Sequence, residues 1–76
     1  MNDNQFDPVE AKIVAYLKRV GAPNTITLIA PEIRETRQTT KDAVARLMSR
    51  RVLFSEPDFT FLANGETEAF GVRNSN

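Results

Sequence analysis

The stretch Thr39–Phe54, TTKDAVARLMSRRVLF, predicts one short helix that runs directly into a strand. Thr39 and Asp42 have the spacing of a capping box, in which a hydroxyl and an acid three residues later accept backbone N–H bonds at a helix start. Three apolar residues then recur at helical spacing and form one face, namely Val44, Leu47 and Met48. We therefore expect a helix at about residues 40–51.

The opposite face of this expected helix is small, polar or basic. It carries Lys41, Asp42, Ala45, Arg46, Ser49 and Arg50. Small side chains allow close approach to DNA, and arginine reaches both base edges and phosphates in the major groove. A solvated amphipathic helix has the same pattern, and surface helices of this kind are common. The segment alone leaves both interpretations open.

Upstream, a helix is expected at about residues 8–20. Asp7 can cap it, and Glu10 completes the capping box. Pro8 suits the first helical position because the N–H that proline lacks has no partner there. Gly21 can supply the left-handed residue that ends the helix, and Pro23 prevents its continuation. A second helix is expected to begin near Pro31, or as early as Thr27, followed by a polar turn at 36–39.

Downstream, two runs rich in β-forming residues predict a hairpin. They are Val52–Ser55 and Phe59–Leu62, and Glu56–Asp58 joins them with a proline and an acid, which are typical turn residues. Phe61 and Leu62 are expected in the core. Glu66–Phe70 is expected to form a last helical turn or a short helix.

The chain has 76 residues, which is enough for one small domain with a modest core. We expect residues 1–6 to be a disordered N-terminal arm, 7–70 the folded domain, and 71–76 a flexible tail. No apolar run approaches the ~20 residues that span a membrane. The polar, acidic N-terminus does not resemble a signal peptide, so a cytoplasmic location is expected.

The sequence contains neither cysteine nor histidine. The usual zinc sites therefore cannot form, and the commonest general base is missing. No pair of carboxylates, nucleophile with a base, or phosphate-binding loop can be assembled from the remaining residues. We expect no metal, no cofactor and no enzymatic activity.

The net charge is zero, but the charges are unevenly distributed. Residues 34–51 contain six basic and two acidic side chains, whereas residues 52–76 contain one basic and four acidic ones. A basic cluster matters more for nucleic-acid binding than the total charge does. The positive charge thus lies on the expected helix at 40–51 and on the segment just before it.

Three short segments occur in an order that suggests a known family. They are Glu32–Glu35 followed by Thr40 and Val44, then Leu47–Leu53, and finally Phe59–Gly65. With these segments, the chain resembles the winged helix-turn-helix domains of bacterial and archaeal transcriptional regulators over about residues 8–70. The resemblance implies a small α+β fold: a three-helix bundle with a C-terminal two-stranded β-hairpin wing and a possible short C-terminal helix.

The resemblance implies that the helix at 40–51 lies in the major groove of double-stranded DNA. Under it, the DNA-binding residues are Arg34, Arg37, Thr40, Lys41, Ala45, Arg46, Ser49 and Arg50. Arg46 is the best candidate for a base contact, and an ion pair with Asp42 is the alternative role for it. Surface ion pairs are equally good explanations for Arg34, Arg37 and Arg50.

Two departures from the family pattern affect this expectation. Arg51 stands where the family usually has glycine between helix and wing, so it must adopt a left-handed conformation or the helix must end differently. The family's turn between its second and third helices often holds a small residue and an apolar one, whereas this chain has Arg37-Gln38-Thr39 there. In addition, the wing turn Ser55–Asp58 is acidic, and a phosphate backbone would repel it.

A small DNA-binding regulator is the first hypothesis, and we expect it to be a homodimer because one helix reads few base pairs. The chain has more aromatic residues than a core of this size needs. Those that could form the dimer contact are Tyr16, Phe54, Phe59 and Phe70. The zero net charge and the acidic wing favour the alternative, a winged-helix protein–protein interaction module that does not bind DNA.

Overall fold

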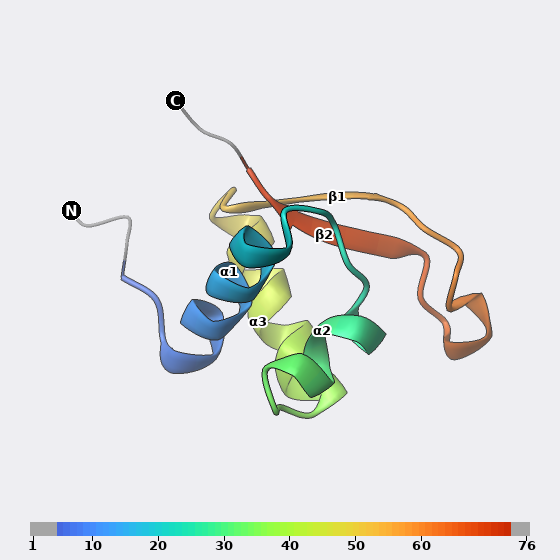
Figure 1. The fold of residues 1–76 in the computed structure, drawn as a ribbon, viewed down its shortest axis with the longest axis horizontal. Coiled ribbons are helices and arrows are strands. Elements are labelled where there is room, and N and C mark those ends of the chain that lie inside the picture. Colours follow the sequence, from blue (N-terminus) through green and yellow to red (C-terminus); the bar gives the residue numbers. More distant parts are fainter. Residues whose placement is uncertain (1–4, 74–76) are drawn as a thin grey trace.

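The computed structural model describes residues 5–73 and contains three helices, a short 3-10 helix and two paired strands. Their bounds are α1 (Pro8–Val20), α2 (Ile26–Glu32), α3 (Arg37–Ser49), β1 (Leu53–Pro57), η1 (Leu62–Asn64) and β2 (Glu68–Val72). Figure 1 shows the helices gathered beside the β1–β2 hairpin, whose connecting loop extends away from them. This is the α+β winged-helix fold that the sequence predicts.

α1 begins and ends where the sequence predicts. The Asp7 carboxylate accepts the Glu10 N–H at 2.8 Å, and the Glu10 carboxylate accepts the Asp7 N–H at 3.0 Å. Gly21 ends the helix in the left-handed conformation, with φ of 73°. Each end is thus determined by local capping, which is why the sequence predicts this helix well.

α2 begins earlier than expected. The start near Pro31 is wrong, because Pro31 lies close to the end of the helix. The alternative start at Thr27 is one residue from the observed first residue, Ile26. Ile26, Ile29 and Ala30 are buried, so the apolar face that packs on the core determines where this helix lies. Its Thr25 N-cap makes no side-chain hydrogen bond and therefore gives little local signal.

α3 also begins earlier, at Arg37, so the segment 36–39 is its first turn. The Thr36 hydroxyl accepts the Thr39 N–H at 3.0 Å, which makes Thr36 the N-cap. The expected box of Thr39 and Asp42 does not form, and Asp42 instead accepts a hydrogen bond from Gln38. After the helix, Arg51 has φ of 62°, the left-handed conformation expected where the family has glycine.

The wing hairpin pairs β1 with β2, and its register runs from Leu53 opposite Val72 to Pro57 opposite Glu68. The predicted second strand at 59–62 is wrong, since these residues lie in the wing loop, and the helical turn expected at 66–70 is largely strand. This register buries Leu53 and packs Val72 against the core, which local propensity alone cannot predict. Gly71 and Val72 belong to β2, and residues 74–76 of the expected tail lie outside the described residues.

The core lies between the three helices and the inner face of the hairpin. Its fully buried side chains include Ile13, Ile29, Leu47 and Leu53. Leu62, expected in the core, is instead 57% exposed on the wing loop. The wing therefore projects from the body, and the longest dimension of the molecule is 40 Å against 24 and 21 Å.

Candidate nucleic-acid interface

α3 has one buried face and one exposed face. Its buried residues are Thr40, Ala43, Val44 and Leu47. The exposed residues on the other side are Gln38, Lys41, Asp42, Ala45, Arg46 and Ser49. We call this set the open face of α3. Thr40, predicted to contact DNA, has 0% exposure, so its side chain is not available to a ligand.

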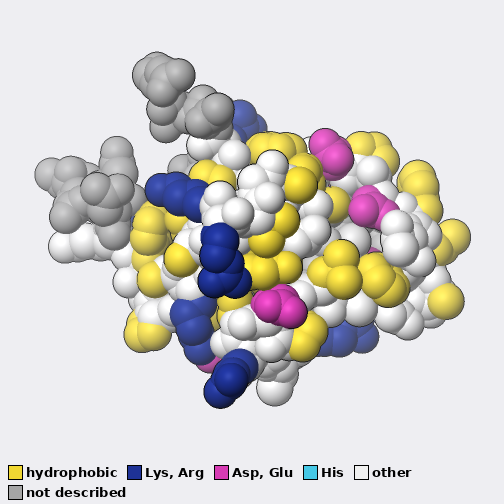
Figure 2. Space-filling view, viewed as in Figure 1, with side chains coloured by type: hydrophobic (Ala, Val, Ile, Leu, Met, Phe, Trp, Pro, Cys, Tyr) yellow, Lys and Arg dark blue, Asp and Glu magenta, His cyan; other side chains and the backbone are white. Residues whose placement is uncertain are grey.

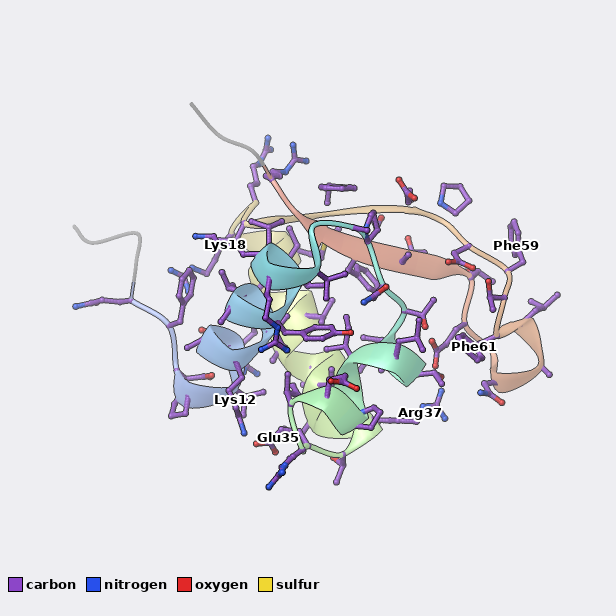
Figure 3. The ribbon with its side chains drawn as sticks, viewed as in Figure 1. Lys12, Lys18, Glu35, Arg37, Phe59 and Phe61 are labelled. Carbon is purple, nitrogen blue, oxygen red and sulfur yellow. The ribbon has the colours of Figure 1, made fainter. Side chains whose placement is uncertain are left out.

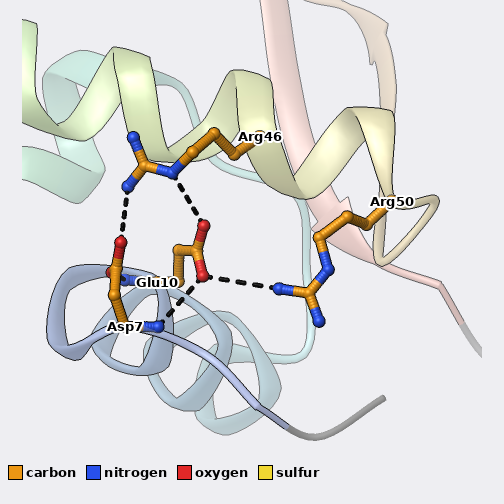
Figure 4. A network of polar contacts seen from close by, with 4 residues as sticks. All are labelled: Asp7, Glu10, Arg46 and Arg50. Atoms are coloured by element: carbon orange, nitrogen blue, oxygen red, sulfur yellow. Dashed lines mark hydrogen bonds and ion pairs between the residues drawn. The ribbon is translucent and has the colours of Figure 1, made fainter. Parts of the chain in front are cut away.

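Arg46 is bound to the N-terminal turn of α1 (Figure 4). Its Nε lies 2.8 Å from Glu10 Oε2, and its Nη2 lies 2.8 Å from Asp7 Oδ2. The Glu10 side chain is only 7% exposed, whereas that of Arg46 is 49% exposed. Arg46 therefore joins α3 to α1, and the ion pair with Asp42, the alternative role for Arg46, does not form.

This network shifts two pKa values. The backbone N–H of Glu10, together with the Arg46 guanidinium, lowers the pKa of Asp7. The hydrogen bond to Glu10 and the nearby Asp7 charge raise the pKa of Arg46. Both groups remain ionised near neutral pH, so the charge pairs persist under ordinary conditions.

Arg50 belongs to the same cluster. Its Nη1 lies 3.4 Å from Glu10 Oε1, and its guanidinium carbon lies 4.9 Å from the centre of the Phe6 ring. A cation over an aromatic face is attracted by the ring quadrupole. Arg50 thus helps to hold the chain before α1 against the end of α3.

Arg37, at the first turn of α3, is bound to the wing. Its Nη2 lies 2.7 Å from Glu66 Oε2, and Glu66 also accepts hydrogen bonds from the backbone N–H and the hydroxyl of Thr27. Partial burial opposes ionisation of Glu66, but the bonds from Thr27 and Arg37 outweigh it and lower its pKa. Figure 3 shows Arg37 at the end of the molecule that carries the wing residues Phe59 and Phe61.

A groove of about 620 Å³ separates α3 from the wing. Arg37, Gln38, Lys41 and Ala45 line its α3 side. Its wing side includes two acids, Glu66 and Glu68. A ligand along α3 would therefore meet cations on one side and carboxylates on the other.

The wing carries no basic residue, since residues 52–72 contain neither lysine nor arginine. It exposes Phe59, which is 62% accessible. The Asp58 carboxylate accepts hydrogen bonds from the Thr60 hydroxyl and N–H, and these bonds lower the pKa of Asp58. Figure 2 shows apolar and acidic side chains over the wing, and lysine and arginine over the half of this face that carries α1.

The other predicted residues have varied positions. Arg34 is exposed, with φ of 59°, in the turn between α2 and α3. Tyr16 accepts a hydrogen bond from Asn24, and Phe70 packs against the core. The Phe54 ring covers Gly71, where an added Cβ would approach it to 2.7 Å. Among the four aromatic candidates for a dimer contact, Phe59 alone is strongly exposed.

The sequence did not single out Gln38 or Glu10. The local pattern predicts a polar turn around Gln38. The signal that places Gln38 in α3 is the N-cap Thr36, which lies three residues before Thr39. Glu10 looked like a capping residue only, and its bond to Arg46 spans 36 residues, beyond any local pattern. Within residues 5–73, no cluster of three metal-binding side chains occurs, and no helix is long and apolar enough to cross a membrane.

Among solved structures, the fold is similar to that of ZitR from Lactococcus lactis, which was determined as a mutant. The TM-score is 0.77 at 14% sequence identity, and the match covers 97% of this chain and 47% of the ZitR chain. This chain thus spans about half the length of that protein. No protein-family description and no curated protein matches the sequence. The likeness supports the winged-helix fold.

Proposed function

We propose that this chain binds double-stranded DNA by inserting the open face of α3 into the major groove, as a transcriptional regulator does. The observation that carries the proposal is that open face, in which Lys41, Ala45 and Ser49 project to solvent from a helix whose other side is buried. The winged-helix fold supports it by analogy, because that fold presents this helix to DNA.

The residues of the open face have complementary roles in this proposal. Gln38 reads a base edge, since a glutamine amide can bond to two atoms of adenine. Lys41 lies near the helix N-terminus, where a phosphate is favoured by the helix dipole. Arg37, outside the open face, is bound to a wing carboxylate and is assigned to holding the wing against α3. Ala45 and Ser49 are small enough to let the helix approach the bases closely.

Arg46, Arg50 and Arg34 have other roles in this proposal. Arg46 and Arg50 are bound by carboxylates of α1, so we assign to them the positioning of α3, with phosphate contact as a secondary role. Arg34 lies at the turn before α3 and is assigned to a phosphate. The wing is assigned no phosphate contact, because its charges are negative.

The test is a titration with labelled random-sequence duplex DNA, followed by fluorescence anisotropy at two salt concentrations. Lys41→Gln should weaken binding roughly three- to tenfold and reduce the salt slope by about one. Arg19→Gln, which removes an exposed cation of α1 outside α3, the groove beside it and the groove between α1 and the strand ends, is the matched control and should have a smaller effect. A wild-type protein that binds no duplex at low salt, as monomer or dimer, would refute the proposal.

A second candidate function is a protein–protein interaction module. The exposed Phe59 and Leu62, together with the acidic residues of the wing, favour it. An NMR titration separates the two functions. DNA should shift the amide signals of α3, whereas a protein partner should shift those of residues 56–66.

A further inference from the structure

We propose that two copies of this chain associate through their wings, each wing tip occupying a groove at the far end of the other copy. We define the wing tip as the exposed apolar residues Phe59 and Leu62 with the neighbouring acids Glu56 and Asp58. This inference does not depend on DNA binding, because neither the wing tip nor the groove includes the open face of α3.

The wing tip exposes an unusual amount of apolar surface. Phe59 is 62% and Leu62 is 57% exposed, and they lie three residues apart on one projecting loop. Figure 3 shows Phe59 pointing away from the body of the molecule. Neighbouring exposed apolar side chains of this size on a small soluble domain are typical of a contact surface.

Hydrogen bonds hold the loop that carries these side chains. The Asp58 carboxylate accepts the Thr60 N–H at 2.9 Å, and the Gly65 N–H donates to the Leu62 carbonyl at 2.8 Å. Glu66 then ties the loop to α2 and α3 through Thr27 and Arg37. A contact surface held in place before binding loses less conformational entropy when it binds.

The groove at the far end of the molecule, which is distinct from the groove beside α3, carries basic instead of acidic residues. It has a volume of about 590 Å³ and lies between the end of α1 and the ends of the two strands. Its apolar lining includes Leu17, Pro23, Phe54 and Val72, and its charged lining is Lys18 and Arg73. Among the described residues, no carboxylate lines it, and neither cation forms an ion pair.

The two surfaces are complementary. An apolar, acidic tip matches an apolar, basic groove, and both are present on one chain, so a second copy is a sufficient partner. Figure 3 shows Lys18 and Phe59 near opposite ends of the molecule. Two antiparallel copies can therefore place each tip over the groove of the other about a single two-fold axis, which closes the assembly as a dimer.

The first test is sedimentation equilibrium of the full chain without DNA. The wild type should dimerise with a dissociation constant of roughly 10–100 µM, as expected for a small interface. The double variant Phe59→Ser with Leu62→Ser should dimerise at least about tenfold more weakly. Leu28→Ser is the matched control, since Leu28 is 43% exposed on α2 and lies outside both surfaces. Circular dichroism should show that all variants remain folded.

The second test exchanges charges between the tip and the groove. Glu56→Lys and Lys18→Glu should each weaken the dimer, and the combined variant should restore most of the affinity because it recreates an opposite-charge pair. A wild type that stays monomeric to millimolar concentration would overturn the proposal. A dimer that tolerates the wing-tip changes, or shows no rescue, would overturn it as well. So would a monomer whose wing binds only a basic, apolar peptide from another protein.

Discussion

Glu10 is a buried carboxylate whose neighbours include two arginines of α3. It lies only 5% exposed, accepts the Asp7 N–H, and contacts Arg46 and Arg50. Local spacing predicted only the capping role, and it offered Asp42 as the partner of Arg46. The sequence does not reveal that Glu10 is the partner of Arg46, because their contact depends on how α1 packs against α3.

Replacing Glu10 with glutamine should therefore destabilise the fold. Glu10→Gln removes the negative charge between two arginines and turns an amide donor toward them, so we expect the free energy of unfolding to fall by about 1–3 kcal/mol. Urea denaturation measures this change. Glu32→Gln, at an exposed acid of α2, is the control and should stay within about 0.5 kcal/mol. Equal urea midpoints for the two variants would contradict the role assigned to Glu10.

The elements differ in how far the sequence predicts them. α1 has a capping box and a terminal glycine, so local chemistry determines both ends. β2 contains Ala69 and Gly71, which are poor strand formers, and it exists because β1 supplies its hydrogen-bond partners. The alternation in Phe59–Leu62 suggested a strand, but pairing these residues would require a different register. Tertiary packing overrides the local pattern there.

The end of α3 gives a prediction about backbone strain. Arg51 is left-handed while the N–H of Val52 donates to the Leu47 carbonyl at 3.0 Å, which resembles a glycine-type helix stop. Arg51→Gly should stabilise the protein by about 0.5 kcal/mol, because relief of strain exceeds the added entropy of the unfolded chain. Thermal denaturation should show the opposite for Ala45→Gly in the middle of α3, a loss of about 1 kcal/mol. Destabilisation by both changes would argue against strain at Arg51.

The anchor of the wing gives a prediction about pH. Glu66 has a pKa below its ordinary value of 4.5, so the folded state holds its proton less tightly than the unfolded state does. Its contribution is complete above about pH 4.5 and is lost as the pH falls through the lower folded-state pKa. Melting temperatures measured from pH 7 to about pH 2.5 should fall in this acid range. Glu66→Gln should lower the melting temperature at pH 7 and flatten the acid decline, whereas Glu32→Gln should keep the wild-type profile.

Across the whole molecule, opposite charges lie in different places. The basic residues of 34–51 lie in α3 and directly on either side of it. In residues 52–72, which form the wing, every charged side chain is acidic, although the net charge of the chain is zero. The sign of the charge in each segment follows directly from the sequence. The sequence did not predict that Glu66 and Glu68 would line the groove beside α3, since their position depends on the register of β2. DNA on α3 would therefore experience an attractive helix and a repulsive wing.

Glu68 should consequently reduce the affinity of the chain for DNA. It is exposed, lines the groove opposite Lys41, and is held by the Ser55 hydroxyl at 3.2 Å. Glu68→Gln should raise the affinity for duplex DNA roughly two- to fivefold at low salt, and Glu68→Lys should raise it further and steepen the salt dependence by about one unit. Fluorescence anisotropy measures both effects. At about 0.5 M salt the three proteins should bind alike, because the Debye length is then only about 4 Å and the charge of Glu68 is largely screened. If the differences in DNA affinity among the three proteins persist at high salt, Glu68 acts through the shape of the wing. If the affinities are equal at low salt, DNA does not bind near this groove.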